Sequence, residues 1–107
     1  MVLVLSTTRF PISKAKEVSK RYIEVAKEFP YDKSLSKDIL RLAARVTGNE
    51  IEGIELSEVK EGKYEEFLKR TMMMQLKYAD IEGINFKNEI FLSGVAALPM
   101  VGLEMPE

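Results

Sequence analysis

The spacing of the hydrophobic residues changes several times along this chain of 107 residues, and these changes limit the folds open to it. Val2 to Leu5 is a short apolar run with β-branched residues, which is typical of a strand buried on both faces. From Ser13 to Pro30 the apolar residues recur at helical spacing, with Ser13 at the expected N-cap and Pro30 ending the segment. The sequence therefore predicts a strand ending at Ser6-Thr7-Thr8 and then a first helix.

The segment 38–59 is expected to form a β-hairpin. Residues 38–47 fit both a helix and an alternating strand, but the turn residues Gly48-Asn49 and the alternating segment 54–59 favour two strands. We expect a loop of three or five residues with Gly48 in the left-handed conformation. A loop of odd length would place Leu40, Leu42, Ala44 and Val46 on one face with Ile54 and Leu56, and Arg41 and Arg45 on the other with Glu55 and Ser57.

The second half of the chain contains another helix and another strand. Helical spacing returns at 61–79, where Met73 is expected to point outward because three consecutive methionines cannot all face one core. Residues 84–92 follow as a strand. The apolar tail 95–103 contains Pro99, which favours an edge strand or an extended arm. We therefore predict one domain, 1–107, with a core at 1–92 and a C-terminal arm at 93–107.

The order strand, helix, strand, strand, helix, strand resembles the ferredoxin-like split βαβ fold, and in particular the superfamily of small dimeric α+β barrels. The resemblance covers nearly the whole chain but rests on element order, length and the hairpin, without a matching functional motif. It implies an α+β fold of βαββαβ order, with a four-stranded antiparallel sheet and two helices on one face. Fold alone leaves the activity open.

Composition excludes several function classes. The sequence has no His and no Cys, which excludes disulfides, zinc sites of the Cys/His type and catalytic triads that need imidazole or thiol. We expect no cofactor and no metal, since the acidic runs have no metal-binding spacing. A net charge of -1 gives no basic surface for nucleic acid. No apolar run is long enough to span a membrane and no targeting segment is visible, so a cytoplasmic protein is expected.

The predicted sheet has one face without helices, and that face cannot be wholly polar. Val2 to Leu5 and Ile90 to Leu92 place large apolar groups on both sides of the sheet. Exposed apolar patches usually mark partner surfaces, and closed twofold dimers are the commonest solution. We therefore predict a homodimer packed sheet to sheet, or a higher homo-oligomer, with the arm sealing an edge or crossing to the partner.

Besides the acidic runs, three groups of residues are candidates for function, each with a structural alternative. Polar anchors on the enclosed sheet face would be Arg41, Arg45, Glu55 and Ser57, which otherwise form cross-strand salt bridges. The inward tyrosines Tyr22, Tyr64 and Tyr78 would donate hydrogen bonds in a cleft, or simply pack. Arg9, in Thr7-Thr8-Arg9, would hold an anion, or belong to an ordinary connector. The ligand-binding candidates are thus Arg41, Arg45, Glu55, Tyr22, Tyr64 and Arg9, and no residue is assigned a catalytic role.

Two functions remain open. The first, which we favour, is a non-catalytic self-associating domain that binds a small molecule or a protein partner. The second is a cofactor-independent enzyme, monooxygenase-like or isomerase-like, acting on a small apolar compound, as the resemblance to dimeric α+β barrels implies. An enclosed pocket of a few hundred Å³ with converging polar groups would favour a ligand-based function over a pure assembly role.

Overall fold

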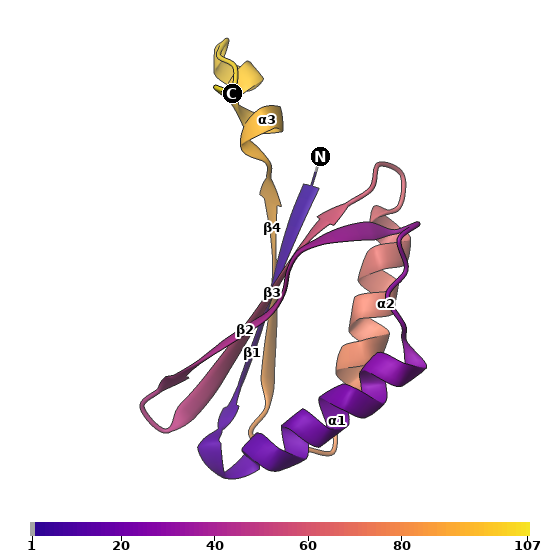
Figure 1. Cartoon of the computed structure of the whole chain (residues 1–107), viewed down its shortest axis with the longest axis vertical. Helices are drawn as coiled ribbons and strands as arrows, with labels where there is room; N and C mark the ends of the chain where they lie inside the picture. The colour runs from indigo at the N-terminus through magenta and orange to yellow at the C-terminus, as the bar shows by residue number, and fades with distance from the viewer. Residues whose placement is uncertain (1) are drawn as a thin grey trace.

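The computed structural model describes residues 2–107 and has two layers, a four-stranded antiparallel sheet and a pair of helices over one of its faces (Figure 1). The elements are β1 (Val2–Pro11), α1 (Ala15–Glu28), β2 (Ser36–Thr47), β3 (Glu50–Val59), α2 (Tyr64–Leu76) and β4 (Asn85–Leu92). The strand order is β2-β3-β1-β4, so that β1 and β3 lie in the centre. This confirms the predicted α+β class and is consistent with a ferredoxin-like arrangement.

Strand β1 is longer than its apolar start suggested. It continues through Thr7, Thr8 and Arg9, because β3 and β4 pair with it from both sides up to Arg9, which lies opposite Glu52 and Asn85. The prediction that Thr7-Thr8-Arg9 forms a connector is therefore wrong. Polar side chains in this half of the strand made it look like a loop, although their alternation on the pleat suits a strand.

Helix α1 presents one apolar stripe to the sheet and ends where predicted. Val18 and Val25, two turns apart, are buried, and the helix stops shortly before Pro30. Its start differs from the prediction: Ser13 lies inside a short 3-10 turn, η1 (Ile12–Lys14), and Lys14 occupies the N-cap without a side-chain hydrogen bond. A serine within the 3-10 turn is no longer at the position where its hydroxyl can accept from the first free amides of the α-helix.

Apart from Glu52 and Gly53 in β3, the buried residues lie at the two ends of the sheet face that carries the helices. At one end Phe10 packs with Val18 and Val25 of α1 and with Tyr78 and Ile81 after α2. The Tyr78 ring meets the Phe86 ring edge to face, with centroids 5.3 Å apart. At the other end the buried residues are Val4, Leu35, Ser36 and Val59. The middle of this face has no large buried side chain, and the helices span it without filling it.

The β2–β3 turn is shorter than predicted. Thr47 pairs with Glu50, so the loop holds two residues, Gly48 and Asn49, and the prediction of three or five residues is wrong. Gly48 has φ +60, which confirms its predicted left-handed conformation, and no non-glycine residue among 2–107 has positive φ. Positive φ at the first central position alone is the pattern of a type II′ hairpin turn.

Irregular pairing in β2, and not a loop of odd length, determines which face of the sheet each β2 side chain occupies. The register shifts between Asp38 and Leu40 and again between Leu40 and Ala43, so that Leu40 faces Leu56 and Ala43 faces Ile54. An extra residue in one strand moves the following side chains to the other face. Arg41 and Arg45, which we expected together, are thereby separated onto opposite faces of the sheet.

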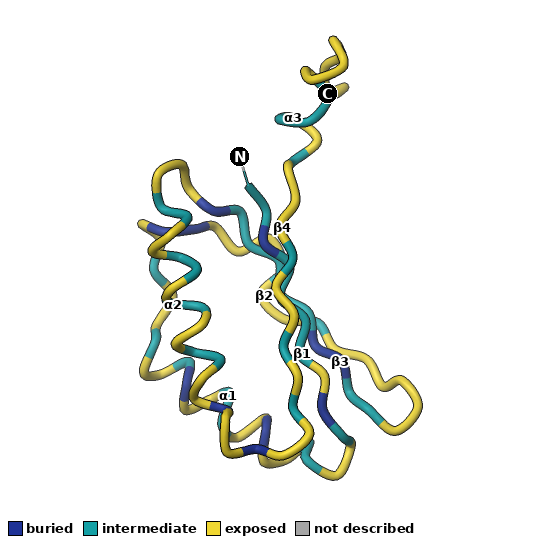
Figure 2. Tube along the Cα trace, turned by 180° about the vertical axis from the view of Figure 1, so that it is seen from behind, coloured by how far each residue is buried: buried dark blue, intermediate teal, exposed yellow. Residues whose placement is uncertain are grey.

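The C-terminal segment is not an edge strand. After β4 the chain forms two short helical turns, α3 (Gly94–Ala97) and η2 (Leu98–Val101), which project beyond the end of the sheet and are largely exposed (Figure 2). The Ser93 side chain accepts from the Ala96 amide and so caps the first turn. Pro99 lies in the first turn of η2, where its missing amide hydrogen costs nothing. These local signals override the extended conformation that we expected.

Candidate ligand-binding site

Between the two helices and the sheet lies a pocket of about 550 Å³, which we call the pocket hereafter. Its floor is the middle of the helix-facing sheet surface, where β1 contributes Ser6 and Thr8 and β3 contributes Gly53 and Glu55. Pairing places Ser6 opposite Glu55 and Thr8 opposite Gly53. The small residues Ser6, Thr8 and Gly53, between the larger residues at both ends, leave the space under the helices open.

The walls of the pocket are mostly apolar. The helices contribute aliphatic, aromatic and thioether groups, and the sheet adds aromatic rings at one end; the apolar lining includes Phe10, Val18, Ala26, Phe29, Leu42, Ile51, Phe67, Met74 and Phe86. Polar side chains between them come from Ser19, Tyr22, Thr71, Gln75 and Tyr78. A mainly apolar cavity of this size with a few polar groups is the usual form of a small-molecule site.

Glu55 is the charged side chain nearest the centre of the pocket floor. Removal from water raises the pKa of its carboxyl to about 6, and the negative charge of Asp38 adds to the rise while Arg41 opposes it. No hydrogen bond or salt bridge joins Glu55 to another side chain within residues 2–107. The site therefore holds a half-buried carboxyl group that titrates near neutral pH and has a free side toward the pocket.

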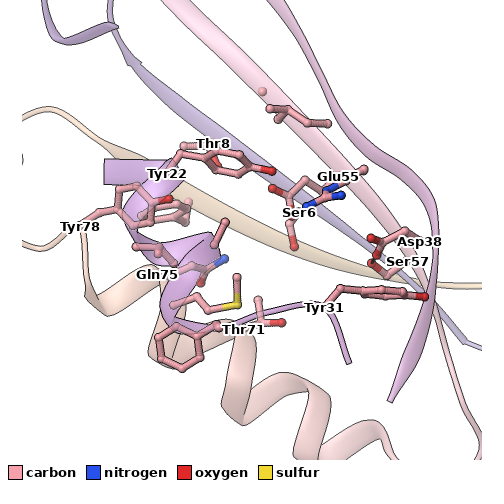
Figure 3. A pocket seen from close by; sticks show the side chains of 18 of the residues that line it. Ser6, Thr8, Tyr22, Tyr31, Asp38, Glu55, Ser57, Thr71, Gln75 and Tyr78 are labelled. Carbon is pink, nitrogen blue, oxygen red and sulfur yellow. Dashed lines mark hydrogen bonds between the residues drawn. The ribbon is translucent and has the colours of Figure 1, made fainter. Parts of the chain in front are cut away.

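Two tyrosines, Tyr22 and Tyr78, line the pocket together with this carboxyl group. Burial raises the pKa of the Tyr22 hydroxyl, with a further rise from the Glu55 charge and an opposing effect from Arg41. Burial also raises the pKa of Tyr78 to about 12, and the Glu55 charge again contributes. Both hydroxyls are therefore neutral donors at neutral pH. Figure 3 shows Tyr22, Ser6 and Glu55 projecting into the space between α1 and the sheet.

The pocket opens toward β2 and the loop after α1. Apolar lining residues on this side are exposed, with Ile23 at 57%, Leu42 at 48% and Tyr31 at 48%. The Tyr31 hydroxyl donates to the Ser36 carbonyl at 2.8 Å, which holds its ring across the opening. Asp38 and Arg41 carry opposite charges on the same rim. A ligand entering here would pass from a polar rim to an apolar interior.

The structure places three of the predicted ligand residues together and separates the other three. Arg41, Glu55 and Tyr22 all line the pocket. Tyr64 lies at the start of α2 and is not part of the lining. Arg9 and Arg45 lie on the opposite face of the sheet, so the expected association of Arg45 with Glu55 is wrong.

Arg9 and Arg45 instead bracket Glu52 across three strands. The Glu52 carboxylate accepts from Arg9 Nε at 2.8 Å and from Arg45 Nε at 2.9 Å, with a second Arg9 nitrogen at 2.6 Å. Hydrogen bonds from Arg9 and then Arg45 hold the pKa of Glu52 below its ordinary value. These two arginines therefore form cross-strand salt bridges, the structural alternative to ligand binding, and share Glu52 as their partner.

Several lining residues escaped the sequence analysis. Ser6 and Thr8 were assigned to the end of a strand and to a connector, and Gly53 to no role. A signal was present in the alternation of β1, because Ser6 and Thr8 are small polar residues on the face of the strand that carries Val4 and Phe10. No pattern in the sequence indicated that the pocket would be lined by Asp38, Tyr31 and Gln75.

Within residues 2–107 the structure has no group of three or more acidic, His or Cys side chains placed to hold a metal ion. No helix in this part of the chain has the length and apolar character needed to cross a membrane.

Comparison with known proteins adds information on the fold. A scan against protein-family models gives no match, and a search of the curated proteins gives none either. Among solved structures, the chain is similar to the de novo designed protein Foldit4, with a TM-score of 0.54 and 17% identity over 86% of this chain and 97% of that one. It is also similar to an uncharacterized NIPSNAP-like domain protein from Burkholderia xenovorans, with a TM-score of 0.44 and 13% identity over 85% of this chain and 84% of that one. The likeness to the designed protein is one of fold alone.

Proposed function

We propose that this chain is a self-associating domain that binds a small, largely apolar molecule in the pocket between its helices and its sheet. The observation that carries the proposal is the pocket itself, about 550 Å³ with an apolar wall and a polar floor. Well-packed small domains leave few voids larger than a water molecule, so a space of this size is unusual unless something occupies it. Apolar walls supply affinity, and the few polar groups fix orientation.

Self-association rests on the other side of the sheet. We call this surface the helix-free face; its apolar residues are Leu3, Leu5, Leu40, Ile54, Leu56 and Phe91. They are half-buried or exposed in the single chain, with Phe91 at 46%. Burying each such side chain stabilises an assembly by roughly 1.5 to 3 kcal/mol at full burial. A second copy packed sheet to sheet would cover them, as in the dimeric α+β barrels that the element order resembles.

The charges on the helix-free face support a twofold arrangement. One end of the face carries an excess of positive side chains, from Arg9, Arg45 and Lys87 against Glu50 and Glu52. The other end carries an excess of negative ones, from Glu58 and Glu89 against Lys37. A twofold axis in the interface and perpendicular to the strands brings opposite ends together. Such self-complementarity favours a closed homodimer over open association.

A second candidate is a cofactor-independent enzyme that moves a proton on an apolar substrate. The observation that favours it is Glu55, whose pKa of about 6 suits a general base at neutral pH. Tyr22 and Tyr78 would then donate hydrogen bonds to an oxygen on which charge develops. Both candidate functions require a small molecule to bind in the pocket, so binding is the property to test.

The test compares a variant that fills the pocket with one that does not. A Cβ atom at Gly53 would lie 3.6 Å from Leu42 Cδ1, an ordinary contact, so Gly53→Val is compatible with β3 and puts two methyl groups on the floor. Thr7→Val, on the helix-free face of β1, is the control. We expect a neutral apolar probe such as phenylbutanol to raise the thermal melting temperature of wild type and Thr7→Val but not of Gly53→Val. Equal shifts in all three proteins would place the probe elsewhere and contradict the proposal.

A further inference from the structure

We infer that the pocket selects an apolar molecule carrying a protonated amine, whose ammonium group pairs with the Glu55 carboxylate beside Tyr22. This inference rests on the proposed function, since it names the ligand class for the same pocket. It follows from the charges that line the pocket, from the aromatic side chain beside Glu55 and from the shape of the apolar wall.

The charged groups around the pocket leave Glu55 without a salt-bridge partner. Arg70, on α2, donates to the Pro30 carbonyl and lies over the Phe29 ring, 5.6 Å from its centroid. Arg41 lines the same side of the pocket and its charge favours ionised Glu55, but among residues 2–107 no salt bridge within 4.0 Å and no hydrogen bond joins the two side chains. Asp38 adds a second negative charge on the same side. A ligand cation would restore the balance that the protein itself leaves open.

Asp38 and Asp32 carry partners of their own, which distinguishes them from Glu55. The Asp38 carboxylate accepts from the Ser57 hydroxyl at 3.4 Å, at the exposed edge of the pocket. Asp32 accepts from the amide and the hydroxyl of Ser34 at 2.9 and 2.6 Å. Glu55 is thus the carboxylate in the pocket whose hydrogen-bonding capacity faces the ligand space.

An aromatic side chain contributes to a cation site. Tyr22 from α1 lines the pocket together with Glu55, whose charge acts on its hydroxyl, whereas Tyr78, in the turn after α2, is buried and packs edge to face against Phe86. A cation is attracted to the face of an aromatic ring as well as to a carboxylate, and both attractions strengthen where water is excluded. A carboxylate and a tyrosine in the same apolar pocket therefore suit an ammonium group. An anionic ligand would have to place its charge beside Glu55.

The apolar part of the ligand has a defined direction. From Glu55 the lining becomes apolar toward Phe10, Val18, Met74 and Phe86, at the end of the sheet away from the charged rim. A molecule with its amine at Glu55 and an aryl or alkyl body extending toward these residues would bury its apolar surface there. Burial of that body supplies most of the affinity, while the amine supplies the selectivity.

The experiment compares three probes with the same apolar body: phenylbutylamine, phenylbutanol and phenylbutyrate. Their affinities for the full-length protein are measured by isothermal titration calorimetry at about pH 8, where the amine is protonated and Glu55 is ionised. We expect the amine to bind about tenfold tighter than the alcohol or better, since a charge-assisted hydrogen bond is worth more than a neutral one. We expect the acid to bind weakest.

Two variants of the same strand make the test specific. Glu55→Gln should lower the affinity for the amine to that for the alcohol and leave the affinity for the alcohol within about twofold. Glu58→Gln, on the helix-free face of β3, should leave all three affinities unchanged. Far-UV circular dichroism of both variants verifies that they are folded.

The outcomes separate the two claims. Equal binding of amine and alcohol by wild type, tighter binding of the acid, or an amine preference that survives Glu55→Gln would overturn the inference while the pocket remains a binding site. Failure of every probe to bind wild type would overturn the proposed function itself.

Discussion

Replacing Glu55 by Gln should stabilise the folded protein, although Glu55 lies in the middle of a central strand. Its pKa rises from the ordinary 4.5 to about 6 on folding, which corresponds to about 2 kcal/mol of unfavourable interaction with the ionised form. Because the side chain is half-buried beside an open pocket, we expect about 1 to 2 kcal/mol after allowance for solvent screening. Gln keeps the shape of the side chain and cannot ionise.

The direction of the pH dependence follows from the raised pKa. The folded state holds the Glu55 proton more tightly than the unfolded state does, so ionisation of Glu55 costs nothing below about pH 4.5 and its full amount above about pH 6. Glu55→Gln and wild type should therefore be equally stable near pH 4, and the variant more stable near pH 8. The charged groups facing Glu55, Asp38 and Arg41, together with Tyr22 and Tyr78, are the same in both proteins and cancel in the comparison.

Urea denaturation followed by far-UV circular dichroism measures this difference at both pH values. Protein concentration is kept equal throughout, because a dimer gains apparent stability with concentration. Glu61→Gln, with the same chemical change at an exposed position between β3 and α2, serves as the control. A variant less stable than wild type at pH 8, or a stability difference that is the same at both pH values, would refute the reasoning that the pocket desolvates Glu55.

Three further predictions concern the rest of the fold. Gly83→Ala should destabilise the protein by more than Gly62→Ala in chemical denaturation. Both glycines have positive φ, +85 and +77, and alanine adopts such a conformation at a cost of about 1 kcal/mol or more. A Cβ at Gly83 would also lie 2.9 Å from the proline ring at the end of β1, whereas a Cβ at Gly62 would meet open space. Leu56→Glu on the helix-free face should convert a dimer into a folded monomer in sedimentation velocity runs at micromolar concentration, and a monomeric wild type would contradict the proposed dimer. Asp80→Asn should lower the melting temperature at neutral pH, because it removes the negative charge and one of the two oxygens that accept from Arg21, at 2.6 and 2.9 Å. Those hydrogen bonds lower the pKa of Asp80 to about 2, so the difference from wild type should shrink as pH falls from 4 toward 2, and a difference independent of pH would contradict this assignment.

The sequence predicted the order and the type of the main elements because each has a strong hydrophobic period. The stripe of Val18 and Val25 identified α1, and the outward position of Met73 followed from helix geometry; Met73 is 53% exposed. The face of the sheet on which each β2 side chain lies was harder to predict. It depends on the irregular pairing between Asp38 and Ala43, which no single residue of the sequence indicates. For this reason Arg41 and Arg45 were expected on the same face but lie on opposite faces.

The candidate site could be predicted only in part. Glu55, Arg41 and Tyr22 were identified because charged or hydroxyl groups stand out among apolar residues. Ser6 and Thr8 were missed because small polar residues in a strand resemble a loop until the neighbouring strands are known to pair along them. A cavity forms where side chains are too small to fill the space between the helices and the sheet. Small residues produce a weaker pattern in a sequence than an apolar stripe does.

The central claim, that a small molecule occupies the space between the helices and the sheet, is tested most directly by a two-dimensional NMR titration of the labelled protein with phenylbutylamine. The account predicts saturable shifts at the amides of Thr8, Tyr22, Glu55, Gln75 and Tyr78, with little change at Leu5 and Ile54 on the helix-free face. No saturable shift, or shifts confined to the helix-free face, would contradict it.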